Sequence, residues 1–270
     1  MIDNEPLNQL CHGDDEVFGA ADFEDGLDDR LVVCFFIEHL RLFGDQLLDD
    51  IAIIRRQGFP HFGAGVFGRN DFADVDHLGR LYENNTYTQK HIESVLALDL
   101  VDVDAIRSAG FKVAIDCVNS VGGIVIPELL KALGVKDVIE LNCTPDGKFP
   151  HNPEPLPENL TQIAGVMKEG KADVGFVVDP DVDRLAIVCE NGEMFVEEYT
   201  LVAVADYVLK HTPGNTVSNL SSSRALRDVT RLYGQQYNAS AVGEVNVVTL
   251  MKQTGAVIGG EGNGGVIYPA

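Results

Sequence analysis

The chain has 270 residues, 45% hydrophobic and 23% charged, which is enough to bury a core in one large domain or two smaller ones. Its 42 acidic and 20 basic residues give a formal net charge of −22, a balance that disfavours binding to nucleic-acid phosphates or anionic membranes. The apolar run at residues 31–37 is far shorter than the roughly 20 residues that a membrane helix needs. We therefore expect a cytoplasmic protein without a signal peptide that binds neither nucleic acid nor membrane.

Residues 1–77 differ in composition from the rest of the chain. They hold 17 acidic and five basic residues, and no Ser, Thr or Lys occurs before Thr86. Glycines and short acidic pieces interrupt the first thirty residues, a pattern typical of loops or disorder. We expect residues 1–77 to be an anomalous acidic segment of uncertain fold.

From about residue 78, predicted helices and strands alternate. Residues 78–98 are expected to form a linker with a helix over 87–98, because Ile92, Val95 and Leu96 recur at helical spacing. In a first unit, residues 99–196, we expect strands at 111–117, 137–141, 174–178 and 185–189 and helices at 124–133 and 160–169. In a second unit, residues 197–270, we expect helices at 199–210, 224–233 and 245–253 and strands at 216–220, 237–242 and 256–259. This alternation predicts an α/β fold of two consecutive layered units with mixed sheets, the second one truncated.

Two polar stretches leave alternatives open. The segment 144–157 contains five prolines and cannot be regular structure, so its His151 suits a catalytic role or a structural one. Ser221, Ser222 and Ser223 precede a predicted helix, where they suit either a helix cap or a phosphate contact.

An acidic turn, Asp179-Pro-Asp181-Val-Asp183-Arg184, stands between two apolar strands. Pro180 favours an extended backbone, and its two-residue period would turn the three aspartates to one side. Three such carboxylates form the all-oxygen ligand set that suits Mg²⁺, while Arg184 can pair with phosphate. One alternative is a solvated acidic turn. Another is an EF-hand Ca²⁺ loop ending at Glu190, which is disfavoured because Arg184 stands where that loop needs glycine and both flanks look like strands.

A glycine-rich turn, residues 259–265, follows the last predicted strand. Its Glu261 and Asn263 could hydrogen-bond the vicinal hydroxyls of a sugar, on a backbone that a ligand can approach closely. The same glycines match a dinucleotide-binding fingerprint, but that fingerprint must open a helix and residues 266–270 look extended. A flexible loop is the remaining alternative.

With these two motifs the chain resembles the α-D-phosphohexomutase superfamily from residue 78 to 269, and the stretches 149–155 and 243–246 also look like its sequences. The resemblance implies an isomerase that moves a phosphoryl group between a phosphoserine and a hexose phosphate, with Mg²⁺ as cofactor. The substrate implied is phosphoglucosamine or phosphomannose/phosphoglucose. Asp179, Asp181 and Asp183 would bind Mg²⁺, and Arg184 would lie at the active site. Glu261 and Asn263 would bind sugar hydroxyls.

Two departures from that family bear on activity, the missing phosphoserine loop and the missing fourth domain. Members have four domains with the phosphoserine in a T-A-S-H-N-P-type loop of the first, whereas the first serine here is Ser94. We expect a fragment that covers the second and part of the third domain, is inactive alone and could self-associate through the truncated domain. The alternative is a non-catalytic module that binds Mg²⁺ and sugar phosphate.

Overall fold

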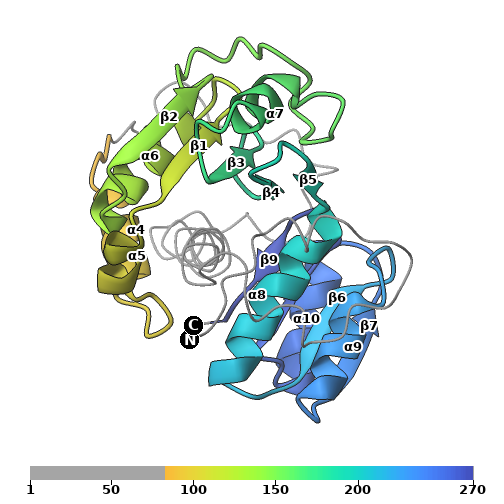
Figure 1. Cartoon of the computed structure of the whole chain (residues 1–270). Helices are drawn as coiled ribbons and strands as arrows, with labels where there is room; N and C mark the ends of the chain where they lie inside the picture. The colour runs from red at the N-terminus through yellow and green to blue at the C-terminus, as the bar shows by residue number, and fades with distance from the viewer. Residues whose placement is uncertain (1–82, 270) are drawn as a thin grey trace, which may run out of the picture.

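The computed structural model describes residues 83–269 (Figure 1). They form two α/β units, each with a sheet that has both parallel and antiparallel strand pairs. The expected acidic segment 1–77 lies outside the described residues. The predicted fold class, two consecutive α/β units with mixed sheets, is confirmed. None of the helices between residues 83 and 269 combines the length and apolar character that crossing a bilayer requires.

The first sheet is built from five strands in the order β2-β1-β3-β4-β5. β1 pairs in parallel with β2 and β3, whereas β4 and β5 continue the sheet in antiparallel pairing. The strands are β1 (Lys112–Asp116), β2 (Asp137–Leu141), β3 (Val174–Val178), β4 (Leu185–Val188) and β5 (Met194–Phe195). The helices of this unit are α4 (Tyr87–Leu96), α5 (Val103–Ala109), α6 (Gly122–Leu133) and α7 (Thr161–Lys168).

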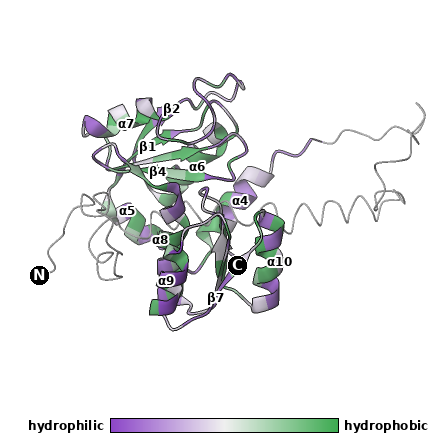
Figure 2. Ribbon diagram, turned by 90° about the vertical axis from the view of Figure 1, so that its right-hand side faces the viewer, coloured by the Kyte–Doolittle hydropathy of each residue, from purple (hydrophilic) through white to green (hydrophobic). Residues whose placement is uncertain are grey.

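Alternate residues of these strands fill two different core layers. Val113 and Ile115 of β1 belong to the cluster that contains Leu129 and Leu133 of α6. Ala114, between them, belongs to the cluster that contains the buried residues of α7. The two-residue period of the strand thus places α6 on one face of the sheet and α7 on the other. In Figure 2 the mostly hydrophobic colouring of α6 in the first unit contrasts with the largely hydrophilic colouring of α9 in the second unit.

The second sheet has the order β7-β6-β8-β9, with β6 parallel to β7 and β8 and with β9 antiparallel to β8. The strands are β6 (Thr216–Asn219), β7 (Tyr237–Ser240), β8 (Ile258–Gly260) and β9 (Val266–Ile267). The helices are α8 (Glu197–His211), α9 (Ala225–Leu232) and α10 (Glu244–Thr254). Since the parallel strands β6, β7 and β8 point the same way, their carboxyl ends share one edge of the sheet, where α/β folds place ligands.

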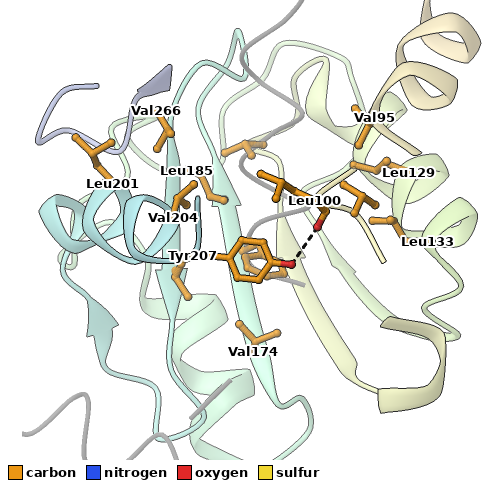
Figure 3. Packing of buried hydrophobic residues seen from close by; sticks show 14 of the residues in the cluster. Val95, Leu100, Leu129, Leu133, Val174, Leu185, Leu201, Val204, Tyr207 and Val266 are labelled. Carbon is orange, nitrogen blue, oxygen red and sulfur yellow. Dashed lines mark hydrogen bonds between the residues drawn. The ribbon is translucent and has the colours of Figure 1, made fainter. Parts of the chain in front are cut away.

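The long helix α8 lies at the junction of the two units. Its buried residues Leu201 and Val204 belong to the same apolar cluster as Leu185 of the first sheet and Val266 of the second (Figure 3). The Tyr207 hydroxyl donates a hydrogen bond of 3.2 Å to the backbone carbonyl of Leu100, near the start of the first unit (Figure 3). One continuous core therefore joins the two sheets.

Two elements differ from the expectation. The helix α5 was not predicted, although Asp102 caps it by accepting a 2.9 Å bond from the Ala105 N–H and Gly110 ends it in the left-handed conformation. A helix of seven residues has too few apolar positions for its helical period to be recognised in the sequence. The strand β5 has two residues and carries no pattern at all. The other predicted helices and strands between residues 87 and 259 are present, with ends that differ by a few residues.

Candidate metal and sugar site

The acidic turn joins β3 to β4 at the carboxyl end of β3. Val178 is paired with Leu185, so the six residues between them close a hairpin. Asp179, Asp181 and Asp183 each offer a carboxylate oxygen, and these oxygens lie within 4.8 Å of one another. Asp179 is buried and the other two are exposed, so a ligand could reach the group from solvent.

The three carboxylates converge for a different reason from the predicted extended backbone. Val182 has a φ of 64°, and its N–H donates a 3.2 Å bond to the Asp179 carbonyl, which makes the segment a tight turn. Oδ1 of Asp179 then accepts the N–H groups of Asp183 at 3.0 Å and Arg184 at 3.1 Å. The turn is therefore wrapped around the buried carboxylate of Asp179.

The charge on this turn is unfavourable without a cation. The pKa of Asp179 is raised to about 7, mainly by burial and also by the neighbouring Asp183 and Asp181, although the Arg184 N–H acts to lower it. Three convergent oxygen donors of like charge, two of them open to solvent, fit a hard divalent cation such as Mg²⁺. The EF-hand alternative is wrong, because the turn lies between paired antiparallel strands and Glu190 follows at the far end of β4.

The guanidinium of Arg184 is held beside the acidic turn. Its Nη1 donates a 2.5 Å bond to Oε1 of Glu154, and its Nε lies 3.7–3.8 Å from carboxylate oxygens of Asp179 and Asp183. Glu154 comes from the proline-rich segment 144–157, which forms no helix or strand, as predicted. The proline-rich segment thus returns to the edge of the sheet that carries the acidic turn. Its Glu154 orients the guanidinium of Arg184, which the family resemblance implies is at the active site.

His151 has a structural environment. Its Nε2 lies 3.2 Å from Oδ2 of Asp116, a carboxylate that is 1% exposed and also accepts the side-chain amide of Asn142 at 2.9 Å. Its Nδ1 lies 2.8 Å from the Asn152 carbonyl, so both ring nitrogens have partners. These contacts favour the structural reading of His151, as an anchor for the segment that carries Glu154.

The glycine-rich turn connects β8 to the antiparallel strand β9. The Glu261 N–H donates to the Gly265 carbonyl at 2.9 Å, and the Gly265 N–H donates to Oδ1 of Asn263 at 3.1 Å. Oε1 of Glu261 accepts the side-chain amide of Asn219 at 2.5 Å and the N–H of Gly243 at 3.0 Å. A strand, not a helix, follows the turn, so the dinucleotide-binding alternative lacks the helix it requires.

The two turns meet. The N–H of Leu185, at the end of the acidic turn, donates a 3.4 Å bond to the carbonyl of Gly264 in the glycine-rich turn. Partial desolvation raises the pKa of Glu244, and the negative charges of Asp183 and Glu261 act in the same direction. The predicted metal residues and the predicted sugar residues therefore lie on two turns that contact each other, and we treat these turns as one candidate site. Glu244, Glu154 and Asn219 were not predicted as parts of it, although Glu244 stands in the 243–246 stretch of the family resemblance.

The contact between the two turns depends on a glycine. Gly264 has a φ of 94°, and a Cβ there would lie 2.6 Å from the backbone carbonyl oxygen of Leu185. We expect Gly264→Ala to lower the free energy of unfolding by about 2–4 kcal/mol, since it adds a steric clash to backbone strain. In the control, Gly255→Ala, φ is 62° and nothing lies within 4 Å, so only the backbone cost of about 1 kcal/mol applies. Equal losses in urea unfolding would show that the turns do not pack as described.

Two family profiles match the chain. Residues 89–192 match "Phosphoglucomutase/phosphomannomutase, alpha/beta/alpha domain II", and residues 197–270 match domain III of the same family.

Individual relatives agree with these profiles. A "Phosphoglucomutase/phosphomannomutase" of Thermococcus kodakarensis is 38% identical over 208 residues, which cover 76% of this chain and 45% of the relative. A "Probable phosphoglucosamine mutase" of Methanopyrus kandleri is 33% identical over 204 residues, covering 75% and 44%. The crystal structure of a phosphoglucomutase/phosphomannomutase family protein of Burkholderia thailandensis aligns with a TM-score of 0.55 at 32% identity, covering 62% of this chain and 38% of that one. The chain spans about half the length of the curated relatives it matches.

Proposed function

Since this chain belongs to the α-D-phosphohexomutase superfamily, as two consecutive domains of the phosphoglucomutase/phosphomannomutase type, we propose that it supplies the metal-binding and sugar-binding part of a phosphohexomutase. Such an enzyme is an isomerase that transfers a phosphoryl group between two positions of a hexose phosphate. The observation that supports the proposal best is the contact between the acidic turn and the glycine-rich turn, because it brings the proposed metal ligands next to the proposed sugar-binding groups.

Each group has a proposed task. Asp179, Asp181 and Asp183 hold Mg²⁺, which when bound neutralises charge on the transferring phosphoryl group. Arg184, held by Glu154, pairs with phosphate oxygens.

The sugar side of the site uses the glycine-rich turn. Glu261 accepts hydrogen bonds from sugar hydroxyls. The Asn263 side chain is exposed and its Oδ1 already accepts the Gly265 N–H, so its amide remains to donate. The proposed substrates are phosphoglucosamine and phosphomannose or phosphoglucose. These compounds appear in the names of the relatives.

For the 270-residue chain by itself, we propose ligand binding without turnover. The sequence contains no T-A-S-H-N-P-type loop, and its first serine, Ser94, lies within helix α4. The second candidate function, a binding module for Mg²⁺ and sugar phosphate, rests on this observation.

One pair of measurements tests both candidates. Calorimetry with glucose 1-phosphate, mannose 1-phosphate and glucosamine 1-phosphate, each with Mg²⁺, should show saturable binding of at least one ligand. An isomerisation assay with the same compounds and a hexose 1,6-bisphosphate should show no turnover above the buffer control. Robust turnover would establish that the chain is catalytically complete, and failure of every ligand to bind would contradict both candidates.

A further inference from the structure

A polar network lies behind the glycine-rich turn, and its centre is the buried residue Asn219, the last residue of β6. Its side chain is 2% exposed. We propose that Asn219 is a positioning residue that fixes the carboxylate of Glu261, and that the serine pair after it fixes Asn219 in turn. The part of this inference that concerns ligands rests on the proposed function of Glu261 in sugar binding.

The hydrogen bonds determine how the Asn219 amide is oriented. Nδ2 lies 2.5 Å from Oε1 of Glu261, and an ionised carboxylate can only accept, so the amide nitrogen must face it. Oδ1 is then free to accept, and it accepts the hydroxyls of Ser221 at 2.9 Å and Ser222 at 2.8 Å. Two donors on one side and a carboxylate on the other leave a single orientation of the amide in which all three of these contacts are made.

This network leaves half of the Glu261 carboxylate available. Oε1 accepts two N–H donors, from Asn219 and from the backbone of Gly243. Within residues 83–269, Oε2 accepts no hydrogen bond. A carboxylate fixed through one oxygen presents the other in a defined position, which is what the orientation of a sugar hydroxyl requires.

The serine turn also supports the loop by direct packing. A Cβ on Gly262 would lie 3.1 Å from the Cα of Ser222, so the backbone of the glycine-rich turn rests on the serine turn. The Ser223 hydroxyl accepts the N–H of Ala225, the first residue of α9, at 3.3 Å, while the N-cap residue Arg224 makes no side-chain capping bond. Ser221 and Ser222 thus contact Asn219, and Ser223 contacts the start of α9, while the phosphate contact expected of these serines stays a prediction.

Two substitutions distinguish positioning from mere packing. Asn219→Ala removes the amide and leaves a cavity. Asn219→Asp keeps the shape and the acceptor for both serines, but puts a carboxylate oxygen against Glu261 in place of the donor. If Asn219 acts by donating to Glu261, we expect hexose phosphate affinity to fall about tenfold in Asn219→Ala and further in Asn219→Asp.

A purely structural role predicts the opposite order, because the isosteric aspartate would disturb the fold less than alanine. Asn219→Asp binding as well as wild type, or better than Asn219→Ala, would overturn the proposal. Mg²⁺ affinity serves as the internal control and should not change. If either variant fails to fold, the double variant Ser221→Ala/Ser222→Ala, which retains the amide, should show a smaller loss of affinity, and an unchanged affinity would count against the network.

A ligand-free measurement keeps this inference separate from the proposed function. In wild-type protein the side-chain amide protons of Asn219 should exchange slowly with solvent by NMR. Glu261→Ala should make them exchange at least about tenfold faster, whereas the control Ser223→Ala should leave them unchanged. No change in Glu261→Ala would overturn the positioning role even if ligands bind. If wild-type protein binds no hexose phosphate, the proposed function fails while the amide result still decides the role of Asn219.

Discussion

Asp181→Ala should weaken Mg²⁺ binding by about 100-fold, because it removes one of three carboxylate ligands from the acidic turn. Asp181 is exposed, so its removal should cost the metal-free protein little stability. Isothermal titration calorimetry with MgCl₂ after chelation of bound metal measures the effect directly.

The matched control is Asp137→Ala, which removes the same charge at an exposed position at the start of β2. Since this residue belongs to no group of three metal-ligating side chains among the described residues, Mg²⁺ affinity should stay within about twofold of wild type. If Asp181→Ala binds Mg²⁺ as tightly as Asp137→Ala, the acidic turn is only a solvated loop.

Asp179→Asn should make the metal-free protein more stable than wild type above pH 7. The pKa of Asp179 is raised from an ordinary 3.8 to about 7 in the folded chain, so the folded state binds this proton more tightly than the unfolded state. The stability contributed by this proton is complete below about pH 3.8 and is lost as the pH rises through about 7. Asparagine resembles the protonated acid, keeps an Oδ1 acceptor for the two N–H groups, and never ionises.

Urea unfolding in chelator at pH 4, 6 and 8 measures this prediction. We expect the variant to match wild type at pH 4 and to exceed it by on the order of 2 kcal/mol at pH 8. At pH 8, added Mg²⁺ should make wild type more stable than the variant. The metal stabilises the folded state that binds it, and only wild type has an ionised Asp179 to do so. A difference between variant and wild type that stays constant from pH 4 to 8 would show that Asp179 titrates normally.

The order of strands and helices could be predicted because the apolar periods of this chain are regular. The acidic turn could be found because its ligands lie within five residues of sequence. The predicted reason for their convergence was wrong, since a left-handed φ at Val182, a β-branched residue, has no sequence signal and is held by the bonds to Asp179.

The groups that were missed are paired over long sequence separations. Glu154 lies 30 residues before Arg184, and Asn219 lies 42 residues before Glu261. The second pair forms because β6 and β8 are neighbours in a parallel sheet, so their carboxyl ends come together. Only the strand order reveals this, and local periodicity does not encode strand order.

The apolar core around α8 limits how far the acidic turn and the glycine-rich turn can move apart. Moving the acidic turn away from the glycine-rich turn would expose Leu201, Val204 and Leu185, which are all buried. An apolar junction of this kind opposes hinge motion between the units. The separation between the acidic turn and the glycine-rich turn is thus close to a fixed dimension of the chain.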